Sequence, residues 1–236
     1  MYNQIGHFAD AGETFAKALF FGGVTRRFPG LNFGVLEGGV GWAASLFCTL
    51  VEVWGKRGYP AIENLDPARL DLEQLEGLFS RYGGERFSGS TGNVAGLGYS
   101  AVTADAVPRE ADLALMDDFA ACGIEKAEDI VDLFAEPIYF GCEADDKLTG
   151  IACSGKALPF GAKLKPVFGS DIGHWDVPNM NEVLGEAYEL VEDDLLDEDG
   201  FRDFTFANAV RLHGGMNPKF FEGTVVEDEA RAILGR

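Results

Sequence analysis

The sequence predicts an α/β fold in which parallel strands alternate with helices. Three short apolar runs with strand character, 31–36, 137–142 and 164–169, are separated by segments with helical periodicity. Strands that alternate with helices in this way are typical of βαβ units around a parallel sheet. No stretch with the composition of a linker divides the 236 residues, so the whole chain is expected to form one structural unit.

Helices are predicted on both sides of the first strand. Residues 11–27 carry apolar side chains at helical spacing, and the strongly apolar segment 40–56 predicts a well-buried helix after the strand. Residues 71–82 predict a more exposed helix. The segment 83–107 is rich in Gly, Ser, Thr and Ala, and a loop of this length is usually functional or mobile.

The second half of the chain predicts shorter helices around the other two strands. They are expected at 110–121, 128–134, 145–154, 181–191, 201–212 and 227–234. Gly214 and Gly215 are expected to end the helix 201–212. The acidic run 192–199 is expected to be a solvated surface loop.

The charge and the apolar pattern exclude several classes of partner. The 39 acidic and 19 basic residues give a net charge of −20, which excludes a nucleic-acid partner and binding to an anionic membrane surface. The apolar stretch 40–51 is too short to span a bilayer, and residues 1–20 lack the features of a signal peptide. The four cysteines have no CxxC spacing, so we expect reduced thiols in a cytoplasmic protein.

An acidic residue follows each predicted strand. Glu37, Glu143 and Asp171 each stand shortly after a Phe-Gly pair at the end of an apolar run. The carboxyl ends of parallel strands lie on one face, which in a barrel carries the active site. Three converging carboxylates repel one another unless a cation or a proton compensates. The pattern therefore indicates a metal site or a general acid.

Alternative roles for these polar residues stay open. Acids after strands also stabilise the first turn of the next helix, and we favour this role for Asp145 and Asp146. His174 lies three residues past Asp171 and is expected to orient or share a ligand or a substrate carboxylate. His213, beside a pair of glycines at a predicted helix end, is expected to be structural.

Three segments carry motifs that occur together in one known family. Residues 27–33 and 36–42 contain Arg-Phe-Pro-Gly and Leu-Glu-Gly-Gly, residues 168–176 contain Gly-Ser-Asp-Ile-Gly-His, and residues 208–218 begin with Asn-Ala-Val-Arg-Leu. In this order they resemble the sixth-strand region, the eighth-strand motif and the C-terminal helix of the amidohydrolase-related family. The resemblance covers roughly residues 11–56 and 137–234.

The resemblance implies a TIM-type (β/α)₈ barrel with one divalent metal, commonly zinc, at the carboxyl ends of its strands. This chain would hold about strands 6 to 8 with their helices, and would lack the N-terminal strands. Asp171 matches the eighth-strand aspartate, a metal ligand or the base for water. Glu37 and His174 would complete the catalytic group, and Glu143 and Trp42 would contact substrate. Because such proteins are often dimers, a homodimer is also expected.

The sequence departs from the family pattern in two respects. Glu37 stands where many members have a histidine, which changes the expected proton chemistry. The first-strand His-x-His pair is absent, since the nearest two histidines, His174 and His213, are 39 residues apart. A catalytic zinc site normally takes about three protein ligands. We therefore expect a truncated polypeptide that needs metal ligands from a missing N-terminal part and is inactive alone.

Three functions are compatible with these observations. The first is a metal-dependent hydrolase or decarboxylase acting on a small organic acid, amide or lactone. The second is a non-catalytic remnant or binding module that keeps the pocket without the metal. The third is a small α/β enzyme that uses the paired carboxylates Glu37, Glu143 and Asp171 without a metal.

Overall fold

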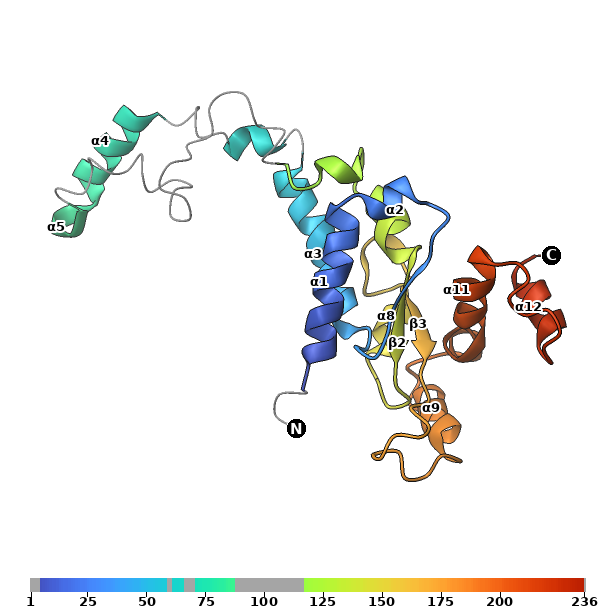
Figure 1. Ribbon diagram of the computed structural model, residues 1–236. Coiled ribbons are helices and arrows are strands. Elements are labelled where there is room, and N and C mark those ends of the chain that lie inside the picture. The colour runs from blue at the N-terminus through green and yellow to red at the C-terminus, as the bar shows by residue number, and fades with distance from the viewer. Residues whose placement is uncertain (1–4, 59–60, 66–70, 88–116, 236) are drawn as a thin grey trace. The chain divides into compact units, whose positions relative to one another are not determined.

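The computed structural model describes residues 5–58, 61–65, 71–87 and 117–235 (Figure 1). The chain packs as two compact units. The larger unit comprises Met1–Trp54 with Ala121–Arg236, and the smaller unit comprises Gly55–Ala120. The predicted strands and the candidate site all lie in the larger unit.

A three-stranded parallel sheet forms the centre of the larger unit. Its strands are β1 (Phe33–Val35), β2 (Ile138–Cys142) and β3 (Lys165–Phe168), in the order β1-β2-β3. Phe33 pairs with Ile138, and Cys142 pairs with Phe168. The three strands predicted from the sequence are thus confirmed, as is the α/β class. Within the described residues the sheet is open, with β1 and β3 at its edges.

Helices cover both faces of the sheet (Figure 1). One face carries α1 (His7–Phe21), α3 (Gly41–Arg57) and the π-helical turn η7 (Val131–Ala135), and the opposite face carries α11 (Asn208–Met216). The other helical segments of the larger unit are α2 (Val24–Arg27), α8 (Thr149–Cys153), η8 (Pro159–Gly161), α9 (Val183–Glu192), α10 (Glu198–Arg202), η9 (Asp203–Ala207) and α12 (Glu227–Ile233). The 3-10 turn η6 (Ala120–Cys122) spans the border of the two units.

The alternation of side chains along the strands explains this arrangement. Val35 points toward α1, because a Cβ on Gly12 of that helix would lie 2.7 Å from Val35 Cγ1. The preceding residue, Gly34, points the other way, and a Cβ there would lie 3.5 Å from Leu212 Cδ2 of α11. Asn32 fixes α11 to the start of β1, since its side-chain amide donates to the Arg211 and Leu212 carbonyls in the middle of that helix.

Aromatic side chains fill the core between the sheet and the first helix layer, which consists of α1, α3 and η7. Phe140 of β2 is fully buried, and its ring lies 5.5 Å from Trp42 and 6.2 Å from Phe134. Phe134 in turn stacks on Phe47 of α3 and meets Phe20 of α1 edge to face. Such pairs add packing specificity to the large apolar area that they remove from water. These rings therefore fix α1 and α3 against the sheet.

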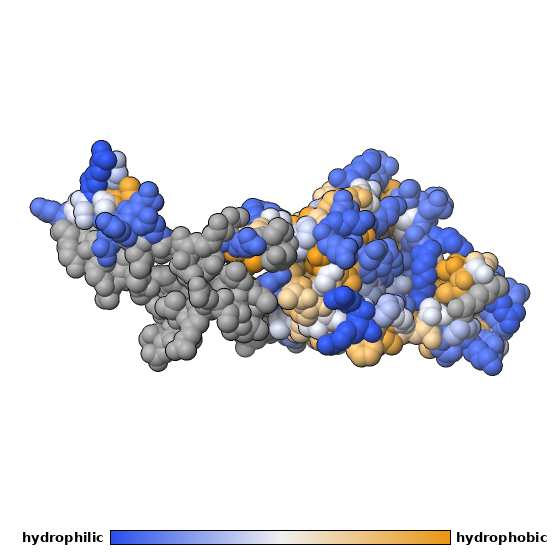
Figure 2. Space-filling view, turned by 90° about the horizontal axis from the view of Figure 1, so that it is seen from above, coloured by the Kyte–Doolittle hydropathy of each residue, from blue (hydrophilic) through white to orange (hydrophobic). Residues whose placement is uncertain are grey.

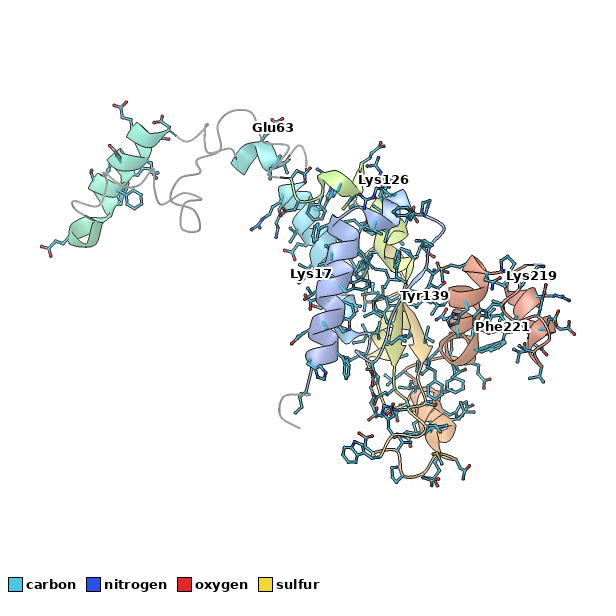
Figure 3. All side chains as sticks on the ribbon, viewed as in Figure 1. Lys17, Glu63, Lys126, Tyr139, Lys219 and Phe221 are labelled. Carbon is cyan, nitrogen blue, oxygen red and sulfur yellow. The ribbon has the colours of Figure 1, made fainter. Side chains whose placement is uncertain are left out.

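Tyr139 is a buried core residue on the opposite face of the sheet (Figure 3). It follows Ile138 and precedes Phe140, so its ring points away from α1 and α3. Burial raises the pKa of its hydroxyl to about 12. Lys165 of β3 lies above the ring, with Nζ 5.2 Å from its centroid, which is a cation–π contact. The tyrosine is therefore a packed structural residue.

Glycines explain where the predicted helices differ from the observed ones. The predicted helix 11–27 is divided into α1 and α2 because Gly23 takes a left-handed conformation, with φ of 63°, where a Cβ would collide with the Ala121 carbonyl. The predicted end at Gly214 and Gly215 is wrong: α11 continues to Met216. A Cβ on Gly214 would lie 2.6 Å from Leu234, so this glycine serves close packing rather than termination.

Other helix predictions hold in part. The predicted helix 201–212 is observed as α10, the π-helical turn η9 and α11 in succession, and of 145–154 only Thr149–Cys153 is helical. The predictions for 40–56, 181–191 and 227–234 are confirmed within a few residues by α3, α9 and α12.

The smaller unit contains η2 (Ala61–Leu65), α4 (Leu72–Tyr82) and α5 (Gly84–Phe87). The predicted helix 71–82 is confirmed, and Asp71 caps it by accepting a hydrogen bond from the Gln74 amide at 2.9 Å. Most of the predicted loop 83–107 and of the predicted helix 110–121 lies outside the described residues.

The surface of the larger unit is predominantly hydrophilic on the face shown in Figure 2, with apolar groups between the charged ones. Among the described helices, none combines the length and the apolar character that crossing a membrane requires.

Candidate functional site

The strand-end residues predicted from the sequence line one hollow. Glu37 follows β1, Glu143 follows β2, and Asp171 and His174 follow β3, and all four lie at the carboxyl edge of the sheet. The hollow has a volume of about 380 Å³. Gly141 of β2 and Val167 and Phe168 of β3 also line it. The parallel order of the strands therefore brings the predicted polar residues together.

Glu37, Asp171 and His174 form the tightest group. One potential ligand atom from each lies within 4.8 Å of the others, and within the described part of the chain this is the group whose spacing suits a metal ion. His174 Nδ1 lies 2.9 Å from Asp171 Oδ1. In a neutral imidazole, that contact makes Nδ1 the hydrogen-bond donor and leaves the lone pair on Nε2. Asp171 thereby orients the imidazole.

Two of these residues have strained backbones. Glu37 has a φ of 63° and Asp171 a φ of 51°, although left-handed conformations favour glycine. Such a conformation costs about 1–2 kcal/mol for an ordinary residue, and it persists where the surroundings enforce it. Each carboxylate stands just past the end of its strand, so the left-handed turn sets the direction in which its side chain leaves the sheet.

Gly141 explains how the β1 exit comes so close to β2. A Cβ on Gly141 would lie 2.9 Å from both the Glu37 nitrogen and the Leu36 Cα, so a larger residue would displace this loop. The Gly141 carbonyl also accepts a hydrogen bond from the Gly39 amide at 3.0 Å. The Glu37 loop is thus seated directly on the second strand.

Glu143 has a perturbed acidity. Partial burial raises the pKa of its carboxyl group, and the negative charges of Asp171, Asp145, Glu37 and Asp176 raise it further. Glu143 therefore keeps a proton to a higher pH than an ordinary glutamate. A protonated carboxyl group at this edge can donate a hydrogen bond to a substrate oxygen.

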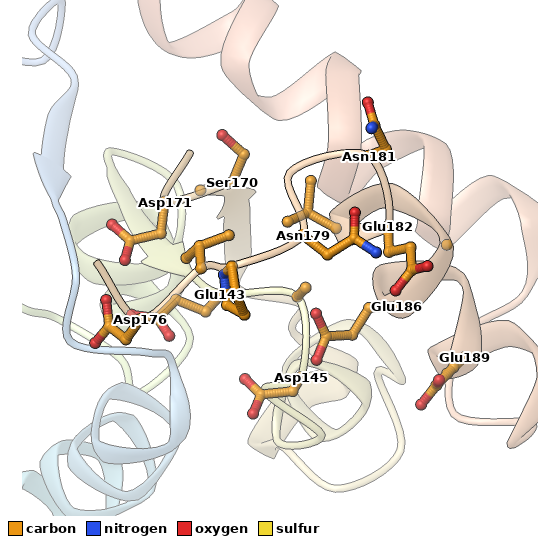
Figure 4. A pocket seen from close by; sticks show the side chains of 16 residues that line it. Glu143, Asp145, Ser170, Asp171, Asp176, Asn179, Asn181, Glu182, Glu186 and Glu189 are labelled. Atoms are coloured by element: carbon orange, nitrogen blue, oxygen red, sulfur yellow. The ribbon is translucent and has the colours of Figure 1, made fainter. Parts of the chain in front are cut away.

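A second hollow, of about 710 Å³, adjoins the first and shares Glu143, Gly169 and Asp171 with it (Figure 4). It is lined by seven acidic residues and by no lysine or arginine. The acids are Glu143, Asp145, Asp171, Asp176, Glu182, Glu186 and Glu189. The negative potential of such a surface attracts cations and repels anions. Glu182, Glu186 and Glu189, at the start of α9 and within it, were not expected at the site from the sequence, although their spacing of four and three residues places them on one helical face.

Trp42 lies outside both hollows. Its ring packs against Phe140, and its Nε1 is buried without a hydrogen-bond partner. Gly38 lies beside it, since a Cβ there would be 3.2 Å from that nitrogen. In this position Trp42 supports the loop after β1, and its contact with substrate stays a prediction.

Among the described residues, the remaining histidines and the cysteines are not part of this group. His213 stacks on Phe220 at 4.6 Å, which agrees with a structural role, and His7 begins α1. Cys48, Cys122, Cys142 and Cys153 form no disulfide. Burial raises the pKa of Cys142 far above its usual value and that of Cys153 to about 12, so neither is an activated nucleophile.

Comparison with known proteins adds no further assignment. No family model matches the sequence, and neither a curated protein nor a solved structure matches the chain.

Proposed function

We propose that the chain contributes the sixth to eighth strands of an amidohydrolase-related (β/α)₈ barrel. In this proposal it acts as a metal-dependent hydrolase or decarboxylase on a small organic acid, amide or lactone. The observation that carries the proposal is the convergence of Glu37, Asp171 and His174 at the carboxyl edge of the parallel sheet. The open order β1-β2-β3 agrees with three consecutive strands of such a barrel.

The donor set fits a divalent cation. Two carboxylates and one imidazole are ligands that zinc accepts, and three protein ligands are usual in a catalytic zinc site. Glu37, Asp171 and His174 would hold the ion. This proposal therefore replaces the expectation from the sequence that the chain needs metal ligands from a missing N-terminal part and is inactive alone. When bound, a divalent cation supplies Lewis acidity and lowers the pKa of water.

The other residues of the hollow would handle the substrate. Glu143, whose pKa is raised by burial and by neighbouring acids, would donate a hydrogen bond to a substrate oxygen. Glu143 lines the smaller hollow together with Glu37, Asp171 and His174, which supports this role.

Cobalt(II) titration of the purified chain tests the proposal, because bound cobalt gives a visible absorption spectrum that reports its ligands. We expect saturable binding of one ion, and a loss of affinity of about 100-fold in Asp171→Asn, which removes a charged ligand. Glu229→Gln removes the same charge from an exposed site on α12 and should bind like the wild type. Absence of binding to the wild type, or equal binding to Asp171→Asn, would refute the proposal.

A binding module without catalysis is the second candidate. The sequence contains three histidines, His7, His174 and His213, so no His-x-His pair is available to complete a histidine-rich zinc site. The two candidates differ in turnover. A cobalt- or zinc-loaded chain that binds the ion but hydrolyses no lactone or amide, and decarboxylates no organic acid, would support the binding module.

A further inference from the structure

Asp146, which lies in a different loop, holds the loop that carries Glu37. The loop runs from Glu37 to Val40, between the end of β1 and the start of α3. Asp146 lies in the turn after β2, and its Oδ2 accepts a hydrogen bond from the Val40 amide at 3.3 Å. Its other oxygen, Oδ1, accepts from the Leu148 amide at 3.0 Å. One carboxylate thus joins the loop after β1 to the loop after β2.

Steric evidence shows how closely Asp146 sits on this loop. Gly39 has a φ of 65°, and a Cβ on it would lie 2.7 Å from Asp146 Oδ2. Any other residue at this position would be strained and would displace the carboxylate. The position of the Asp146 carboxylate therefore requires a glycine at residue 39.

The charge of Asp146 also suits the place where α3 begins. The Ala44 amide donates to the Val40 carbonyl at 3.0 Å, so Val40 is the residue that precedes the first turn of this 17-residue helix. Valine has no side-chain acceptor for the exposed amides of a helix start. Asp146 supplies that acceptor from another loop, and its negative charge is favoured at a helix N-terminus.

We propose that Asp146 is a positioning residue for the cation group, acting through Glu37. The left-handed turn at Glu37 is unfavourable for a glutamate and needs an external restraint. The bonds from Gly39 to Gly141 and from Val40 to Asp146 supply it just downstream. With the loop held in this way, the Glu37 carboxylate reaches Asp171 and His174. The inference rests on the proposed function, because it assigns Asp146 an effect on cation affinity.

The test compares three variants of the full chain. Asp146→Ala removes both acceptors, and Asp146→Asn keeps a single carbonyl acceptor. Asp197→Ala is the matched control, because Asp197 Oδ1 accepts from the Gly200 amide at 2.7 Å at the start of α10, away from the cation group. Both alanine variants lose an aspartate that caps a helix, so their stabilities should fall comparably. Circular dichroism verifies that each variant is folded.

We expect cobalt affinity about 10-fold to 100-fold weaker in Asp146→Ala, an intermediate loss in Asp146→Asn, and a change within about twofold in Asp197→Ala. Equal affinity in folded Asp146→Ala and wild type would overturn the inference while leaving the cation site intact.

Amide hydrogen exchange provides a second readout that needs no metal. Exchange at Gly39 and Val40 should be faster in Asp146→Ala than in Asp197→Ala. If the wild type binds no cobalt, the proposed function and the effect of Asp146 on affinity both fail. Unchanged exchange at these two amides would separately show that Asp146 does not hold the loop.

Discussion

Glu37 and Asp171 reach the same hollow because each leaves its strand through a left-handed turn. Both residues have a left-handed backbone conformation, which an aspartate tolerates better than a glutamate, so the turn at Glu37 depends more on neighbouring groups. At Glu37 the neighbours are Gly141, whose missing side chain leaves room for the loop, and Asp146, which bonds to Val40. The position of one carboxylate therefore depends on residues more than 100 positions further along the chain.

Gly141→Ala tests this dependence. The added Cβ would lie 2.9 Å from two backbone atoms of Leu36 and Glu37, so we expect a loss of about 1–3 kcal/mol in the free energy of unfolding. Urea denaturation measures it. Gly185→Ala in α9 is the control, because a Cβ there meets no atom within 4 Å, and helix propensity should make that change neutral or stabilising by up to about 1 kcal/mol. Equal stabilities of the two variants would contradict the steric account.

Glu143 makes stability depend on pH. Its pKa in the folded protein is raised above 4.5, so the ionised carboxylate destabilises the folded state at pH values above the folded pKa and has no effect below the unfolded one. We expect Glu143→Gln to raise the melting temperature at about pH 7 in metal-free buffer, and the gain to disappear near about pH 4. Thermal denaturation across this range measures it. Glu229→Gln should show no such pH-dependent gain, and a gain for Glu143→Gln that persisted in acid would argue against charge as its cause.

The residue-level site was predictable only in part. Glu37, Glu143 and Asp171 could be found because parallel strands end at one edge, and His174 follows Asp171 on the same loop. The role of Asp146 could not be found, since its bond to Val40 depends on how two loops meet. The sequence suggested that Asp146 stabilises the first turn of the following helix, but α8 has no side-chain cap, and Asp146 instead accepts from the Val40 amide before α3.

At the level of elements, Phe140 joins the sheet to its first helix layer. Its fully buried ring contacts Trp42 of α3 and Phe134 of η7. Phe140→Ala would leave a cavity at the centre of this layer, and we expect a loss of about 3–5 kcal/mol in the free energy of unfolding. Chemical denaturation measures it. Phe15→Ala on α1, where the ring is 51% exposed, is the control and should cost far less. A small loss for Phe140→Ala would mean that the layer does not depend on this ring.

Strands and helices were predictable to different degrees. The three strands are short apolar runs buried by their neighbours, and each was placed to within about two residues. Helix ends were harder to predict, because a glycine can either end a helix or lie inside one. Gly23 ends a helix through its left-handed conformation, whereas Gly214 lies inside one to let Leu234 approach. Only the tertiary contacts distinguish the two cases.

For the whole molecule, the net charge of −20 opposes the compact state through self-repulsion. Screening should relieve this repulsion, since the Debye length falls from about 30 Å at 0.01 M salt to about 3 Å at 1 M. We expect the melting temperature to rise by several degrees when potassium chloride is raised over this range. Sucrose of equal osmolality separates screening from solute exclusion. A melting temperature that fell or stayed constant with added salt would show that repulsion is not a major cost.

The acidic surface also bears on the central claim, because a cation could be drawn to the larger acidic hollow instead of to Glu37, Asp171 and His174. Anomalous diffraction from crystals of the zinc-soaked protein distinguishes these outcomes by placing the ion directly. We expect one strong peak bonded to the two carboxylates and the imidazole at about 2.0–2.2 Å. A peak confined to Glu182, Glu186 or Glu189, or no peak at all, would contradict it.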